Sequence, residues 1–183
     1  LGVVNFAHGA LYMIAAYCAV FVAGKLGFPV AVILVPVLLF VLGYAMERGL
    51  IRFFYERPHT DQILVTFGLA ITTEELLKWI FGSNNIPFAT PDWGTGIVQL
   101  QNYLFFLEGF VVFPKWRIIL IGVSLAVIAA LFSLLKFTRF GLVIRAGMRD
   151  SGMLRFLGVN ISQRFAIVFG LGALIAGVAG VFG

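Results

Sequence analysis

The chain has 183 residues, of which 61% are hydrophobic and only 11% are charged. Soluble domains carry about 25% charged residues, so this composition excludes an ordinary soluble fold and indicates a polytopic membrane protein. Thirteen Lys and Arg residues against eight Asp and Glu residues give a formal net charge of +5. The cations lie beside apolar runs rather than in a stripe with exposed aromatic side chains, which argues against a nucleic-acid surface.

Apolar runs of membrane-spanning length predict an all-α fold with about five transmembrane helices in a single domain over residues 1–183. In chain order the expected spans are about 6–23, 26–46, 62–81, 117–135 and 165–183. The third span is polar in its second half. In the long connection 82–115, the apolar stretches Ile97–Phe105 and Phe110–Phe113 suit either a short hairpin or a segment in the membrane interface.

The distribution of cations predicts the orientation of these spans. Segment 47–61 holds three Lys or Arg residues and segment 136–164 holds six, whereas the turn 24–28 holds only Lys25. Because Lys and Arg resist translocation, we expect both cation-rich segments to face the cytoplasm and 82–115 to face outside. The third span must then cross the membrane despite its polar half. Since Leu1 and Gly183 both lie in apolar sequence, we expect an internal fragment of a longer protein.

Two polar residues, Asn5 and His8, lie at the start of the first span. Such groups are costly in hydrocarbon unless they line a cavity or bond to other helices. A helix broken near Gly9 would present free N–H groups and a positive dipole end to a passing carboxylate. Hydrogen bonding between neighbouring helices explains the same residues equally well.

The third span carries a polar face that includes Thr66, Thr72 and Glu74, followed by Glu75 and Lys78. Glu74 and Lys78 are spaced i, i+4 in the favourable order for an ion pair. One interpretation places this face on a translocation path. The other places the charged group near the outer headgroups, since tilt of the helix can change the depth of a residue in the membrane by several positions.

Small residues recur every four positions in the last span, as Gly172, Ala176 and Gly180 and as Ala173 and Gly177, which predicts close helix packing. No nucleotide-binding, zinc or nucleophile motif occurs, and the single Cys18 excludes a disulfide framework. We therefore expect no catalytic residue, metal ligand or cofactor in this chain. If ATP drives transport, another subunit must hydrolyse it.

Between the last two spans, Arg145 to Gly158 predicts a short surface helix with both an apolar and a charged face. Met148, Met153, Leu154 and Leu157 are apolar, and Arg145, Arg149 and Arg155 are charged. Such a helix either lies on anionic lipid or inserts its apolar side chains into a groove of a cytosolic partner.

Three ordered blocks resemble the permeases of branched-chain amino acid ABC transporters. The first is V-N-F-A-H-G-A-L-Y-M-I-A-A-Y at Val4–Tyr17. The second is Y-E-R-P at Tyr55–Pro58 with L-V-T-F-G-L-A-I-T-T-E-E-L-L at Leu64–Leu77. The third runs from F-T-R-F-G-L-V-I-R-A at Phe137–Ala146, through F-L-G-V-N at Phe156–Asn160, to Val181.

The resemblance implies a multi-pass permease of a bacterial or archaeal inner membrane that pairs with a second permease subunit. It also implies two cytoplasmic P-loop ATPase subunits, which bind ATP and Mg, and a periplasmic substrate-binding protein. The family's coupling segment would correspond to about 145–160, with Arg145, Arg149, Met153, Phe156, Leu157 and Gly158. The family's polar broken-helix motif would correspond to Asn5–Gly9. With the polar face of the third span, the candidate pathway residues are Asn5, Phe6, His8, Gly9, Thr66, Thr72 and Glu74. This chain has Asp150–Met153 where relatives are richer in Ala and Glu, and Gly152 lowers helix propensity by about 1 kcal/mol.

Other functions remain compatible with the residues alone. A proton- or sodium-coupled carrier would use Glu74, Glu75 and His8 as its relay. An ABC permease for urea or short amides would share the same architecture, and a membrane scaffold would need no pathway. Neither the carrier nor the scaffold explains the three ordered blocks.

Overall fold

The computed structural model describes residues 6–55, 57–82, 86, 90–99 and 112–183. Its elements in chain order are α1 (Ala7–Leu26), α2 (Phe28–Gly49), the 3-10 turn η1 (Ile51–Phe54), α3 (His59–Phe81), η2 (Asp92–Gly94), β1 (Ile97–Gln99), β2 (Val112–Pro114), α4 (Lys115–Phe137), α5 (Arg139–Arg149), α6 (Ser151–Phe156) and α7 (Ile161–Phe182). The five predicted spans thus all fall on long helices, within a few residues of the expected bounds.

Among the described residues, four helices, α1, α2, α4 and α7, are long and apolar enough to cross a membrane. This arrangement confirms a polytopic, mostly helical membrane protein. The exception is α3, whose 23 residues suffice in length. Because Glu74, Glu75 and Lys78 lie close together in its last third, α3 is not apolar enough to qualify by composition.

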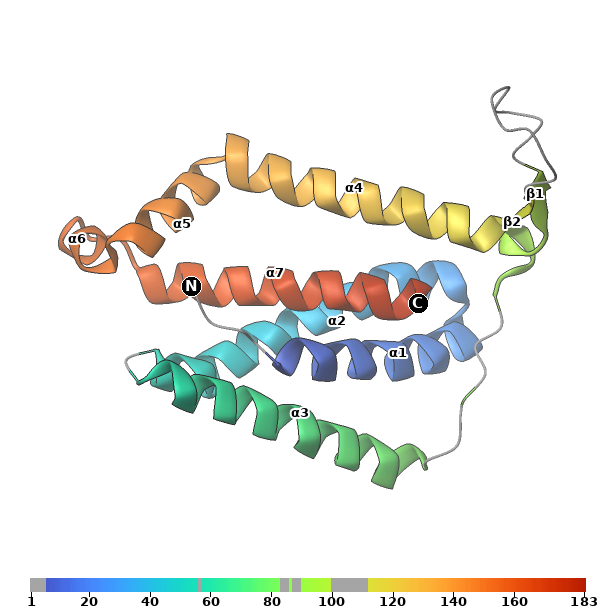
Figure 1. The fold of residues 1–183 in the computed structure, drawn as a ribbon, viewed down its shortest axis with the longest axis horizontal. Helices are drawn as coiled ribbons and strands as arrows, with labels where there is room; N and C mark the ends of the chain where they lie inside the picture. Colours follow the sequence, from blue (N-terminus) through green and yellow to red (C-terminus); the bar gives the residue numbers. More distant parts are fainter. Residues whose placement is uncertain (1–5, 56, 83–85, 87–89, 100–111) are drawn as a thin grey trace.

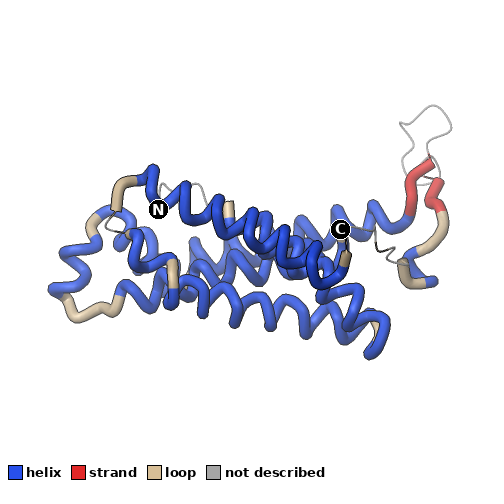
Figure 2. Tube along the Cα trace, turned by 90° about the horizontal axis from the view of Figure 1, so that it is seen from below, coloured by secondary structure: helices blue, strands red, loops and turns tan. Residues whose placement is uncertain are grey.

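The long helices lie side by side and alternate in direction from α1 to α4 (Figures 1 and 2). Segments 47–61 and 136–164, the two cation-rich segments, meet at one end of the bundle, at the left in Figure 1. We call this the cation-rich end. The turn 24–28, η2 and the β1–β2 pair lie at the opposite end. The helix directions therefore agree with the alternation that the cation count predicted.

The bundle is built around α7, which presents two stripes of small residues to two different helices. Toward α1, a Cβ placed on Gly180 would lie 2.5 Å from the Ala15 Cβ. Toward α2, a Cβ on Gly177 would lie 2.8 Å from the Pro36 Cα. The stripes that the sequence predicted as packing surfaces therefore bring the helix backbones into direct contact.

In contrast, α4 contributes no buried residue and is attached to the other elements mainly at its two ends. At the end of the bundle opposite the cation-rich end, Trp116 stacks on Phe182 of α7 with ring centroids 5.8 Å apart. Its Nε1 donates a hydrogen bond to the Phe182 carbonyl oxygen at 3.1 Å. Phe28 and Trp93 complete this aromatic cluster, with centroids 5.8 and 5.9 Å from Trp116. Aromatic residues of this kind are typical of the membrane–water interface.

The long connection forms a short antiparallel pair, in which Ile97 faces Pro114 and Gln99 faces Val112. Of the two alternatives for this region, the structure favours the hairpin. Residues 100–111, between the two strands, lie outside the described residues. The strands lead directly into α4, so they place Trp116 beside Trp93.

Candidate functional site

The first candidate region is the start of α1, which lies about halfway through the bundle. A Cβ on Gly172 would lie 2.9 Å from the His8 Cε1 and Nε2 atoms, so the imidazole rests directly against α7. Gly172 is eleven residues after Ile161, or about 17 Å along a helix of about 33 Å. The ring of His8 is also edge-on to Phe169, with centroids 6.3 Å apart. The start of α1 therefore places a polar side chain at mid-depth.

The same region also contacts α3. Phe6 caps α1 without a side-chain hydrogen bond, and its ring meets Phe67 edge-to-face at 5.8 Å. The helix begins at Ala7, two residues before Gly9, so Phe6 to Gly9 form its first turn. Asn5 lies outside the described residues. Of the predicted pathway residues, Phe6, His8 and Gly9 therefore lie together at the first turn of α1.

The predicted polar residues of α3 have partners within their own helix. The Thr66 hydroxyl is buried and donates to the carbonyl oxygens of Gln62 and Ile63 at 3.0 and 3.1 Å. The exposed Thr72 hydroxyl donates to the Gly68 carbonyl oxygen at 2.8 Å. Neither hydroxyl group therefore needs a ligand to satisfy its donor capacity.

The Lys78 ammonium group joins both acidic residues of α3. Its Nζ lies 2.7 Å from Oε1 of Glu74 and 3.0 Å from Oε1 of Glu75. The Glu74 side chain is 47% exposed, so the group lies on the outer surface of the helix. The ion pair predicted from the i, i+4 spacing is confirmed and extends to a third residue. The geometry fits the interpretation that places these charges near headgroups more closely than a dry relay.

The second candidate region is the predicted coupling segment, about 145–160, which the structure divides in two. We predicted one surface helix over Arg145–Gly158, but α5 already begins at Arg139 and the helix breaks at Asp150. Asp150 has an extended backbone, and its Oδ1 accepts a hydrogen bond from the Met153 N–H at 2.9 Å, as in an N-cap. The single helix was therefore wrong, and the break comes from an Asp cap rather than from Gly152.

Local capping fixes the start of α5 and the end of α6. Thr138 accepts a hydrogen bond from the Gly141 N–H at 3.2 Å and starts α5. Gly158 ends α6 with φ of +77°, and the Val159 N–H donates to the Leu154 carbonyl oxygen at 3.1 Å. This is the pattern of a Schellman motif, in which the residue after the helix adopts a left-handed backbone conformation that favours glycine. Gly158 therefore sets the sharp turn from α6 into α7.

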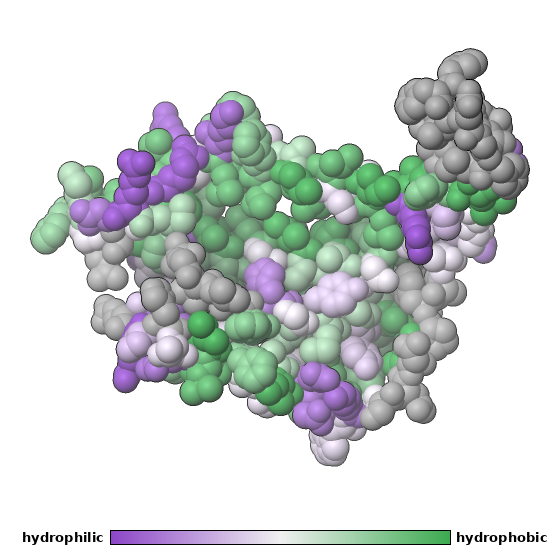
Figure 3. Space-filling view, viewed as in Figure 1, coloured by the Kyte–Doolittle hydropathy of each residue, from purple (hydrophilic) through white to green (hydrophobic). Residues whose placement is uncertain are grey.

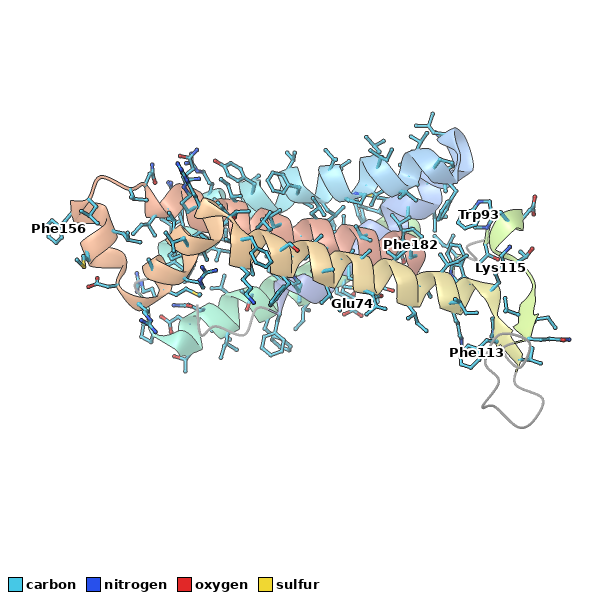
Figure 4. All side chains as sticks on the ribbon, turned by 90° about the horizontal axis from the view of Figure 1, so that it is seen from above. Glu74, Trp93, Phe113, Lys115, Phe156 and Phe182 are labelled. Atoms are coloured by element: carbon cyan, nitrogen blue, oxygen red, sulfur yellow. The ribbon has the colours of Figure 1, made fainter. Side chains whose placement is uncertain are left out.

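The apolar side chains of this segment project away from the protein. Phe156 is 93% exposed, Leu157 68% and Met153 63%. Figure 4 shows Phe156 at the far tip of α6, with Trp93, Lys115 and Phe113 at the opposite end of the molecule. Hydrophilic side chains gather beside the tip, over α5, whereas the surface along α4 is mainly hydrophobic (Figure 3). The predicted docking residues Arg145 and Arg149 are exposed on α5.

The backbone of α5 rests on the first turns of α7. A Cβ on Gly147 would lie 3.9 Å from both the Ile161 Cγ2 and the Phe165 Cε1 atoms, and 3.5 Å from the Leu154 Cδ1 atom of α6. The Asn160 side chain caps α7 by accepting from the Gln163 N–H at 3.1 Å. The coupling segment is thus attached directly to the helix that holds the bundle together.

A buried carboxylate, which the sequence did not single out, lies close to this attachment. Glu47 is in the last turn of α2 and is fully buried. Burial, and then the neighbouring Glu47 carboxylate, raise the pKa of the half-buried Tyr55 hydroxyl, which therefore keeps its proton. In the sequence, Glu47 is only the first acid after an uncharged run, next to Arg48. That pattern resembles an ordinary solvated helix end, so it gave no signal of burial.

Within the described residues, no group of three or more His, Cys, Asp or Glu side chains is arranged to hold a metal ion. The arrangement offers instead a polar helix start at mid-depth and an exposed apolar tip at the cation-rich end. These features suit a membrane component on which a soluble partner acts, and they do not form a cluster of reactive groups.

Comparison with known proteins agrees with this architecture. The family described as "Branched-chain amino acid transport system / permease component" matches residues 1–182. The chain is 26% identical to the high-affinity branched-chain amino acid transport system permease protein LivH of Escherichia coli K12 and of Salmonella typhimurium LT2, and 27% identical to the corresponding protein BraD of Pseudomonas aeruginosa. Each match covers 99% of this chain but only 60–61% of the relative. No solved structure matches the chain. The chain, a multi-pass membrane protein, therefore belongs to the permease family of branched-chain amino acid transport systems.

Proposed function

We propose that this chain is the core of a permease subunit in an ATP-binding-cassette importer for branched-chain or related amino acids. Two cytoplasmic ATPase subunits, a second permease and a periplasmic binding protein complete the transporter. The proposal is supported most directly by α6 and the residue that follows it, since Met153, Phe156 and Leu157 project from the cation-rich end. Apolar side chains on a short helix are suited to a groove on a soluble partner.

The start of α1 is the proposed contact with the substrate. A branched-chain amino acid has charged groups beside an apolar side chain. His8 supplies a polar group at mid-depth. Its ring meets Phe169, and the neighbouring Phe6 meets Phe67, so apolar surface lies beside it. Asn5 joins this group on the basis of sequence alone. Thr66 and Thr72 are assigned to the wall of the path, with their hydroxyl groups bonded within α3, whereas Glu74 is assigned with Lys78 to the outer headgroup region.

Energy from ATP hydrolysis enters at α6 in this mechanism. Closure of the two ATPases displaces α6, and the short Gly158 turn passes the displacement to α7. Because His8 rests on Gly172 of α7, the start of α1 moves with it. The site then opens toward the cytoplasm.

The experiment replaces Leu157 by Asp in the full-length permease, assembled with its partner subunits in proteoliposomes. Since Leu157 is mostly exposed, Asp is compatible with folding but places a charge in an apolar groove. We expect ATP-driven leucine uptake to be lost while ATP hydrolysis continues. Leu157→Met, which keeps the apolar contact, is the matched control and should retain uptake. Normal uptake by the Asp variant would refute the docking role of α6.

The same preparation separates the other functions. Uptake by the permease without ATPase subunits would support an ion-coupled carrier. Competition by urea or acetamide, with none by leucine, valine or isoleucine, would assign the transporter to amides.

A further inference from the structure

Three cations from three different helices lie where α4 meets α5. Lys136 is in the last turn of α4, Arg139 is the first residue of α5, and Arg164 is in the first turn of α7. The Arg164 guanidinium lies over the Phe140 ring of α5, 5.9 Å from its centroid, which brings α7 to this corner. All three side chains are exposed. We call Lys136, Arg139 and Arg164 the corner cations.

Hydrogen bonds hold the two helices together at this corner. The Thr138 hydroxyl donates to the Leu134 carbonyl oxygen of α4 and accepts from the Gly141 N–H of α5 at 3.2 Å. The Arg145 guanidinium donates to the Leu135 carbonyl oxygen in the last turns of α4. The corner is therefore a fixed junction, and the backbone positions on either side of Thr138 are set by it.

The corner cations have no acidic partner. Among the residues that the structure describes, the only salt bridges are those of Lys78 with two acids of α3, toward the opposite end of the bundle. Segment 136–164 has a single acid, Asp150, whose Oδ1 accepts a hydrogen bond from the Met153 N–H of α6. Cations gathered without counter-charges repel one another and attract anions. The corner therefore favours an anionic ligand.

Apolar side chains are interleaved with these charges. The Lys136 Nζ lies over the Phe132 ring at 5.0 Å and over the Phe137 ring at 5.6 Å, measured to the centroids. Phe137 is 73% exposed, and Leu142 on α5 is 62% exposed. An acidic protein surface or a free anion would leave such rings in water. The interface of a bilayer accepts both kinds of group, since cations reach phosphates while stems and rings meet acyl chains.

The exposed surface of α4 leads directly to the corner. This helix is long and apolar enough to cross a membrane, and none of its residues is buried. Hydrophobic surface follows α4, and hydrophilic side chains gather over α5 at its end (Figure 3). A phospholipid has the same order of groups, with acyl chains next to a phosphate. The match in polarity therefore favours a lipid over a soluble anion.

We propose that the corner cations bind the headgroup of an anionic phospholipid in the cytoplasmic leaflet, with its acyl chains along α4. Each Lys or Arg near an anionic membrane surface strengthens binding by about fivefold. The cation-rich end then has two separate surfaces, the corner for lipid and α6 for a soluble partner. The lipid site goes beyond the proposed function, because neither the site nor its test depends on transport.

A tryptophan at the corner reports on the lipid beside it. Phe137→Trp is introduced in the full-length permease, where the exposed position tolerates the larger ring. The protein is reconstituted in vesicles of phosphatidylcholine that contain brominated phosphatidylglycerol or, with the same brominated acyl chains, phosphatidylcholine. Bromine quenches the fluorescence of tryptophans that it contacts. We expect the emission that Phe137→Trp adds to the parent spectrum to be quenched at a lower fraction of phosphatidylglycerol than of phosphatidylcholine.

Charge variants in the same background locate the site. Replacing Lys136, Arg139 or Arg164 by Gln should lower the preference for phosphatidylglycerol by about fivefold each, and the triple variant should remove it. Arg164→Lys keeps the charge and should keep the preference. Arg48→Gln is the matched control, because Arg48 is an exposed cation of the same end that lies over a ring of its own helix α2. It should leave the preference unchanged.

The triple variant should still insert in the same orientation. Segment 136–164 keeps three Arg residues in it, as many cations as segment 47–61. Raising the salt concentration should weaken the preference of the unsubstituted corner, since exposed charges are screened. The melting temperature in detergent should be the same for all the charge variants.

Several results would overturn the lipid site. One is equal quenching of Phe137→Trp by the two brominated lipids. Another is a loss in Arg48→Gln as large as in the corner variants, which would indicate only a diffuse surface field. Gln variants that keep the lipid preference but bind the ATPase subunits more weakly would assign the corner to a protein partner. A permease without ATP-driven uptake would refute the proposed function and leave the lipid site standing.

Discussion

The close contact between α7 and α1 yields a quantitative prediction for Gly180. The Cβ of Gly180→Ala would lie 2.5 Å from the Ala15 Cβ and 2.8 Å from the Ala16 backbone nitrogen. Carbon atoms in favourable contact are about 3.5–4.0 Å apart, so α1 must move away by about 1 Å or more. Overpacking of this kind costs about 1–3 kcal/mol, while Ala in place of Gly returns up to about 1 kcal/mol of helix propensity.

We therefore expect Gly180→Ala to destabilise the permease by about 1–2 kcal/mol. For a chain of this size, that corresponds to a melting temperature lower by about 2–8 °C. Tryptophan fluorescence during heating of the purified permease in detergent measures it. Gly122→Ala on α4 is the control, because no atom lies within 4 Å of its new Cβ. Equal melting temperatures for the two variants would refute the claim that α7 and α1 are in backbone contact.

Three further predictions concern single contacts. Trp116→Phe removes the donor to the Phe182 carbonyl oxygen, so it should cost about 1 kcal/mol and lower the melting temperature by a few degrees in the same assay. Asp150→Ala removes the cap of the six-residue α6; it should reduce ATP-driven uptake severalfold, and Asp150→Asn should restore it, since both Asp and Asn cap helices well. Lys78→Met should change neither melting temperature nor uptake appreciably, because the ion pairs are largely solvated; a selective loss of uptake would place Glu74 on the path.

Features that depend on hydrophobic runs and on residue spacing could be predicted from the sequence. The apolar runs located the helices because about 20 consecutive apolar residues have few alternatives to a spanning helix. The small residues of α7 predicted close packing, since glycines at this spacing, such as Gly177 and Gly180, let helix backbones approach each other closely. The sequence did not show which helix each stripe contacts. That assignment depends on the directions and positions of α1 and α2.

The coupling segment shows where local patterns are insufficient. Its apolar and charged positions are compatible with one continuous helix, and Gly152 was the visible weak point. The break instead occurs where Asp150 gains a hydrogen bond from the Met153 N–H. Asp is a common helix-surface residue as well as a cap, so only the backbone conformation distinguishes the two uses. The contact of Tyr55 with Phe165 joins two segments far apart in the sequence and had no local signal at all.

The way in which α7 is packed limits how a force on α6 can be transmitted. Gly177 and Gly180 bring α7 against the backbones of α2 and α1, so sliding along either helix would drive these glycines into atoms already in contact. Packed interfaces of this kind tend to shift as units rather than deform continuously. We therefore expect α1, α2 and α7 to move together. The junctions that can change are those without backbone contact, namely the long sides of α4 and the ring contact of Tyr55 with Phe165.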